Sequence, residues 1–73
     1  MWIKGTLSDT LINLDKCSHI CFFKTARNVR AIFYANGEKI GVIGLPSEMT
    51  EEDFIHSIMK AAPVCQYYEV EEG

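Results

Sequence analysis

VRAIFYANGEKIGVIG, residues 29–44, is the stretch of this chain that predicts its structure most directly. The dipeptide Asn36-Gly37 stands between two runs rich in apolar and β-branched residues. Such a two-residue loop favours a type I′ turn, because both residues tolerate positive φ and the twist of the turn suits paired strands. We therefore predict a β-hairpin over residues 29–35 and 38–44, with Ala35 opposite Glu38 and Tyr34 opposite Lys39.

The predicted register sorts the hairpin side chains onto two faces, because successive residues of a strand point to opposite sides. One face is almost wholly apolar and is expected to be core; it carries Val29, Ala31, Phe33, Ile40 and Val42. The other face mixes apolar and basic residues; it carries Arg30, Ile32, Tyr34, Lys39 and Ile43. This second face is too apolar for ordinary solvent-exposed surface and too charged for a second core.

A helix is predicted after the hairpin, with Thr50 as N-cap and Asp53 at the third helical position. Met49 and Phe54 have the spacing of a hydrophobic staple, and Pro63 is expected to end the helix. The apolar stripe of the predicted helix contains Phe54, Ile55, Ile58, Met59 and Ala62. We expect this stripe to cover the core face of the hairpin.

Three further segments have strand character: residues 1–3 with 11–14, residues 18–24, and the tail 64–70. The chain is therefore predicted to be a single α+β domain over residues 1–73. Its core is expected to be a small antiparallel meander of about four strands, with one helix on one face and a possible last edge strand. The strand over 18–24 is expected to add Cys21 and Phe23, or Ile20 and Phe22, to the uncovered face; Trp2 is a further candidate.

The small size of the chain also favours an interaction with a partner. A chain of 73 residues buries only about 60% of the surface of its unfolded form, so its stability margin is small. Because 48% of the residues are hydrophobic, there is apolar surface to share with a partner. We therefore predict a non-enzymatic protein-interaction or assembly module without a small-molecule substrate. It is expected to form a homodimer, or to dock on another protein, through the sheet face that the helix leaves uncovered.

Charge is distributed unevenly, although the net charge is only −3. Residues 1–47 carry six basic and three acidic residues, whereas residues 48–73 carry Lys60 and seven acids. These acids are Glu48, Glu51, Glu52, Asp53, Glu69, Glu71 and Glu72. The alternative prediction is an acidic inhibitor or regulator that docks on a basic partner, such as a nucleic-acid-handling complex; a solvated helix start and tail would explain the same residues.

The chain has three cysteines, an odd number that favours free thiols and a reducing compartment. Cys17, His19 and Cys21 would share one strand face and suggest a thiol or metal site, with Cys65 or His56 as a further ligand. However, three such side chains spread over about 13 Å of an extended strand, too far to share one ion. We therefore predict no metal, no cofactor and no catalytic residue, and a thiol or metal site at Cys17, His19 and Cys21 stays a further alternative.

The basic residues Lys16, Lys24, Arg27 and Arg30 alternate with Phe22 and Phe23 in a stretch without acids. Aromatic and basic residues together suit single-stranded nucleic acid, but four cations are few, so we expect no such partner. No run of about 18 apolar residues suggests a membrane span, and a soluble, cytoplasmic protein is expected.

The opening Met1-Trp2-Ile3, the segment Leu11-Ile12-Asn13-Leu14 and a hairpin leading into an acid-started helix resemble a loose group of short bacterial and prophage-encoded proteins. The resemblance extends over residues 1–62 and does not include the cysteines or the tyrosine-rich tail. It implies a small accessory protein built as a β-meander followed by one helix, and it brings no site residues with it.

Overall fold

The Asn36-Gly37 turn is formed as predicted, with φ of 53° at Asn36 and 81° at Gly37. It joins β4 (Val29–Ala35) to β5 (Glu38–Gly44) in a computed structural model that describes residues 1–73. The other elements are β1 (Trp2–Gly5), β2 (Ile12–Asn13), the 3₁₀ turn η1 (Leu14–Lys16), β3 (His19–Lys24), α1 (Glu51–Ala61) and β6 (Tyr67–Val70). The α+β class with a small meander and one helix is thus confirmed.

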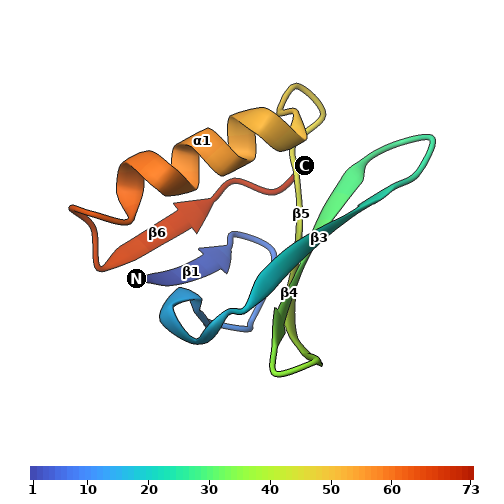
Figure 1. Ribbon diagram of the computed structural model, residues 1–73. Helices are drawn as coiled ribbons and strands as arrows, with labels where there is room; N and C mark the ends of the chain where they lie inside the picture. The colour runs from blue at the N-terminus through green and yellow to red at the C-terminus, as the bar shows by residue number, and fades with distance from the viewer.

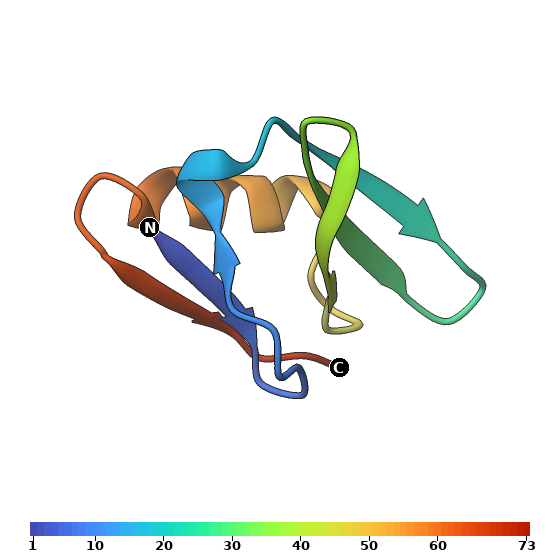
Figure 2. The same cartoon turned by 90° about the horizontal axis from the view of Figure 1, so that it is seen from below.

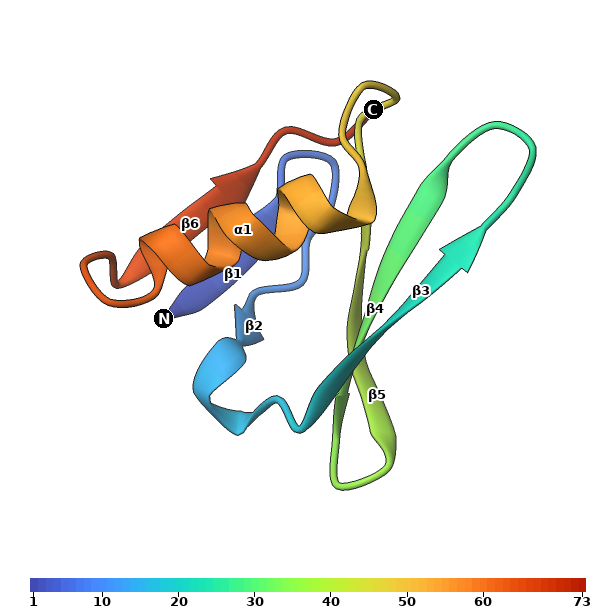
Figure 3. The ribbon, with the colours of Figure 1, turned by 45° about the horizontal axis from the view of Figure 1, so that its top comes forward.

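The strands divide between two three-stranded sheets (Figure 1). The antiparallel meander β3-β4-β5 is one of them, and the order of the other is β2-β1-β6. The tail forms the edge strand that the sequence suggested, and β6 pairs parallel to β1 with Ile3 opposite Tyr68. Helix α1 and the β2-β1-β6 sheet both lie on one side of the meander, so the hydrophobic core is enclosed between the three (Figures 1 and 3).

The hairpin register changes one step beyond the turn. Tyr34 pairs with Lys39 as predicted, but Phe33 then pairs with Gly41 because a β-bulge leaves Ile40 as an extra residue. Every later residue of β5 is consequently shifted to the opposite face. Ile43 is fully buried beside Ala31, so its predicted place on the uncovered face is wrong, as is the core placement of Val42, which pairs with Ile32.

Helix α1 begins as the sequence predicts. The Thr50 side chain accepts from Asp53 N–H at 3.1 Å, and the Asp53 carboxylate accepts from Thr50 N–H at 3.1 Å, which completes a capping box. The helix ends at Ala61, two residues before Pro63. With 11 residues it lacks the length that crossing a membrane would need, and no other helix of the structure has the length and hydropathy for it.

The buried stripe of α1 is narrower than predicted. Phe54 and Ala61 are buried, and Ile58 is packed partly against the core. Ile55 and Met59, in contrast, are 40% and 66% exposed. Ile55 and Met59, at one edge of the predicted stripe, therefore face solvent and do not belong to the core.

Two contacts join the sheets. Ile12 lies directly over Gly41, where a Cβ atom would overlap its side chain, so Gly41 packs against the other sheet. Glu72 supplies the second contact, because its carboxylate accepts from Leu7 N–H at 3.0 Å, the Ser8 hydroxyl at 2.9 Å and Gly44 N–H at 2.9 Å.

The predicted strand 11–14 is shorter in the structure. Asn13 caps a 3₁₀ turn by accepting a hydrogen bond from Asp15 N–H at 3.1 Å, so pairing with β1 is limited to Ile12 and Asn13.

Candidate functional site

The outer face of the β3-β4-β5 sheet, which points away from the core, is the main candidate surface. The paired strands set its side chains in three rows: His19, Tyr34 and Lys39; Cys21, Ile32 and Val42; Phe23, Arg30 and Gly44. Of the five residues predicted for this face, Arg30, Ile32, Tyr34 and Lys39 lie there. We name these nine positions the outer face.

The chemistry of the outer face is apolar in the middle and basic at two margins. Phe23 is 56% exposed, and Ile32 and Val42 are half-buried. The rings of His19 and Tyr34 stack with centroids 4.8 Å apart and planes 7° from parallel. No carboxylate lies among the nine positions, so the face has no internal partner for Arg30.

Nothing in the chain covers the outer face. Helix α1 and the β2-β1-β6 sheet are both on the inner side of the meander (Figures 1 and 3). Trp2, a predicted member of the face, belongs to β1 in the other sheet and is 44% exposed there. The flanking strand contributes Cys21 and Phe23, the first of the two sets the sequence left open, whereas Phe22 turns inward against Phe54 at 6.1 Å between ring centroids.

Two members of the outer face, His19 and Val42, were not predicted from the sequence. His19 is found by extending the strand register to Tyr34, a step that the sequence allowed. Val42 could not be found in this way, because nothing in the sequence marks the bulge at Ile40.

The thiol and imidazole groups do not form a site. Cys17 precedes β3 and donates its S–H to the backbone carbonyl of His19 at 3.2 Å, while Cys21 lies within the strand. Cys17, Cys21 and Cys65 are all free. The structure contains no group of three or more His, Cys, Asp or Glu side chains able to hold a metal ion.

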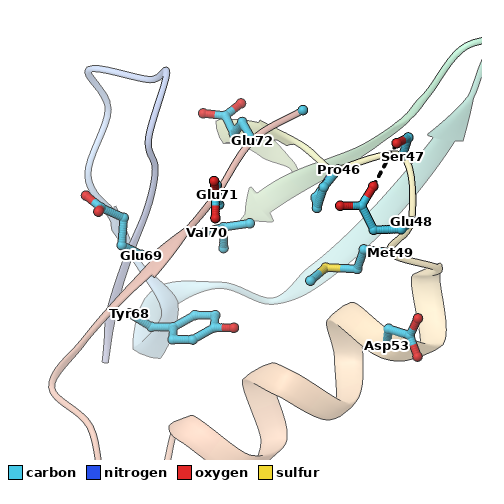
Figure 4. A pocket seen from close by; sticks show the side chains of 11 residues that line it. Pro46, Ser47, Glu48, Met49, Asp53, Tyr68, Glu69, Val70, Glu71 and Glu72 are labelled. Atoms are coloured by element: carbon cyan, nitrogen blue, oxygen red, sulfur yellow. Dashed lines mark hydrogen bonds between the residues drawn. The ribbon is translucent and has the colours of Figure 1, made fainter.

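Acidic residues from two distant segments do come together. A hollow of about 710 Å³ lies between the loop before α1, the start of the helix and the C-terminal segment (Figure 4). The acids that line it are Glu48, Asp53, Glu69, Glu71 and Glu72. We name this feature the acidic hollow; Glu51 and Glu52 lie outside it, and Glu72 is engaged in the hydrogen bonds that join the sheets.

Two pKa values near the acidic hollow are shifted. The backbone N–H and side chain of Thr50 stabilise the ionised Asp53 carboxylate and hold its pKa below the ordinary value of 3.8. The Tyr67 hydroxyl donates to Glu69 at 3.0 Å, which raises the pKa of Tyr67 above the ordinary value of 10.0. Both shifts arise from local hydrogen bonds, and both groups are exposed.

The basic residues do not form a platform for stacked bases. Phe22 faces the core and Phe23 the outer face, so the two rings are on opposite sides of the sheet. Lys24 forms an ion pair of 3.4 Å with Glu51. The remaining cations, Lys16, Arg27 and Arg30, are exposed on separate segments.

No protein family, curated protein or solved structure matches the chain.

Proposed function

We propose that this protein is a small, non-enzymatic interaction module that self-associates through its β3-β4-β5 sheet. One observation carries the proposal: the outer face exposes Phe23 beside Ile32 and Val42, and no part of the chain packs over it. Exposed apolar patches with a polar rim mark interaction sites, and symmetric self-association is the commonest arrangement of soluble assemblies.

The outer face is small compared with the area that a stable protein interface buries. Three strands with three outward positions each present roughly 14 by 20 Å, or about 300 Å² of flat surface. A stable interface buries about 800 Å² on each partner. Two outer faces stacked on each other therefore supply less than half of this area, so a stable dimer must also use another part of the sheet.

The mass in solution tests the proposal. Sedimentation velocity of the whole chain at micromolar and higher concentrations is expected to show a dimer, twice the 8.3 kDa of one chain. A single species of one-chain mass at every concentration would overturn the proposal.

A second candidate function rests on the acidic hollow. Glu48 and Asp53 line one hollow with Glu69, Glu71 and Glu72 although the two segments are distant in the chain, so their negative charges act together on a basic partner. Binding of a fluorescent Lys-rich peptide measures this. Glu48→Lys with Glu71→Lys is expected to abolish binding at low salt, whereas Glu38→Lys at the hairpin turn leaves it unchanged; equal binding by both variants would contradict this function.

A further inference from the structure

The two sheets have four edges, and β3 is the edge with the least protection. The β2 strand has two residues, and the β6 edge carries the acid Glu69 with Glu71 directly after it. On the β5 edge, Gly44 N–H is already bonded to Glu72. The β3 strand has six residues with no proline, and its one basic residue, Lys24, stands at the end. Natural proteins normally block such an edge with charges, proline or a covering segment.

The outward backbone groups of β3 follow from the hydrogen bonds of its neighbour. Leu45 N–H donates to the Val29 carbonyl at 2.8 Å, so every second residue of β4 from Val29 points toward β5. The alternate β4 residues point toward β3, which directs the N–H and C=O groups of Ile20, Phe22 and Lys24 out of the sheet. No hydrogen bond joins these groups to any other element, and β3 lies at the margin of the molecule (Figure 2).

One flank of α1 begins beside the end of β3. Glu51, Ile55 and Met59 are spaced by four residues and therefore form one ridge of the helix, and Ile55 and Met59 are 40% and 66% exposed. The ion pair between Glu51 and Lys24, at 3.4 Å, joins the first residue of the ridge to the last residue of β3. From this point α1 runs toward β6 and diverges from β3 (Figures 1 and 3). Only the beginning of the ridge therefore lies beside the β3 edge.

We propose that a second copy of this chain occupies the β3 edge, with β3 of each copy pairing antiparallel about a two-fold axis at Cys21. The two meanders then form one continuous six-stranded sheet, and Ile20 and Phe22 of each strand lie on its inner face. This inference deepens the proposed function and rests on it, since it specifies how the dimer forms.

Symmetry and hydrogen bonding select the register. Outward-pointing residues must face one another, which an axis at any residue of β3 allows. An axis at Cys21 or at Phe22 pairs five residues of each strand, whereas an axis at Ile20 or at Phe23 pairs only three, so the first two are favoured. An axis at Phe22 sets Lys24 against Ile20, a charge against an apolar side chain. An axis at Cys21 sets Ile20 against Phe22 and His19 against Phe23, with no like charges opposed.

A cross-link at Cys21 tests this register. The two Cys21 residues form a non-hydrogen-bonded pair with Cα atoms about 4.5 Å apart, close enough for a disulfide. In the variant Cys17→Ser/Cys65→Ser, diamide is expected to take two electrons and two protons from the paired thiols and leave one S–S bond per dimer. The matched variant Cys17→Ser/Cys21→Ser keeps the exposed Cys65 and is expected to stay uncross-linked. Equal cross-linking of both would overturn the register.

Charged substitutions at Cys21, on the two-fold axis, test the contact between the two strands without a covalent cross-link. Cys21→Lys and Cys21→Glu each oppose two like charges across the axis and are expected to raise the dimer dissociation constant by at least about tenfold. An equimolar mixture of the two variants is expected to restore the dimer as a heterodimer.

The outcomes separate this inference from the proposed function. A wild-type chain that stays monomeric overturns both. A wild-type dimer that survives Cys21→Lys but dissociates with Tyr34→Glu, on the middle strand, overturns the edge pairing and leaves self-association through the face. A dimer that survives Tyr34→Glu and dissociates with Cys21→Lys supports the edge.

Discussion

Gly41 is the position at which Ile12 of the other sheet packs against the meander. An added methyl group would overlap Cδ1 and Cγ1 of Ile12, a fully packed side chain that is 2% exposed and has little room to turn. We expect Gly41→Ala to destabilise the fold by about 1–3 kcal/mol in urea unfolding. Gly44→Ala is the matched control on the same strand, because its Cβ would make an ordinary contact of 3.5 Å. Removing Cδ1 with Ile12→Val is expected to restore part of the loss; equal stability of the two alanine variants would contradict this packing.

Glu72 lies near the chain end and joins three segments at once. Its carboxylate accepts from Leu7, Ser8 and Gly44, so Glu72→Ala leaves these donors without a partner. We expect a loss of about 1–3 kcal/mol in the free energy of unfolding and faster amide exchange at Gly44. Glu71→Ala, whose side chain has no hydrogen bond, serves as the control. The same effect in both variants would mean that charge alone matters.

At the scale of elements, the α1 capping box gives a pH dependence. The folded pKa of Asp53 lies below its ordinary 3.8, so its contribution to stability is complete above that value and is lost as pH falls through the folded pKa. We expect the stability of the wild type to fall more steeply between about pH 5 and pH 2 than that of Asp53→Asn. Urea unfolding across this range measures the difference, and parallel profiles would contradict the assignment.

Removing the cap itself is a separate test of the helix start. Thr50→Ala is expected to cost about 1 kcal/mol, because the Asp53 N–H loses its acceptor. Ser47→Ala, in the preceding loop, is the control, since its hydroxyl bonds only to the exposed Glu48. Equal melting temperatures of Thr50→Ala and Ser47→Ala would show that the cap does not contribute to stability.

The elements themselves were largely predictable, because their signals are local. Asn36-Gly37 marked the hairpin, and Thr50 with Asp53 marked the helix start. The bulge at Ile40 was not predictable, since no local pattern marks it. In the fold it places Gly41 beneath Ile12, a residue far away in the chain. One shifted residue was enough to exchange Ile43 and Val42 between the two faces.

At the scale of the whole molecule, the second sheet depends on long-range pairing that no local pattern encodes. The parallel alignment of β1 with β6 joins the two ends of the chain, and it was visible in the sequence only as a β-prone tail. Four of the nine positions of the outer face were predicted from the sequence. Cys21 and Phe23 were one of the two sets that it left open for the flanking strand. The open edge of β3 became recognisable only from the strand order of the sheet.

Pairing of two copies along β3 can be tested without any substitution, by residue-resolved amide exchange. The N–H groups of Ile20 and Phe22 point out of the isolated sheet, whereas those of Cys21 and Phe23 bond to β4 in either state. If the two copies pair, exchange at Ile20 and Phe22 slows as the protein concentration rises through the dimer dissociation constant, while exchange at Cys21 is slow throughout. Exchange at Ile20 and Phe22 that stays fast and independent of concentration would contradict this pairing.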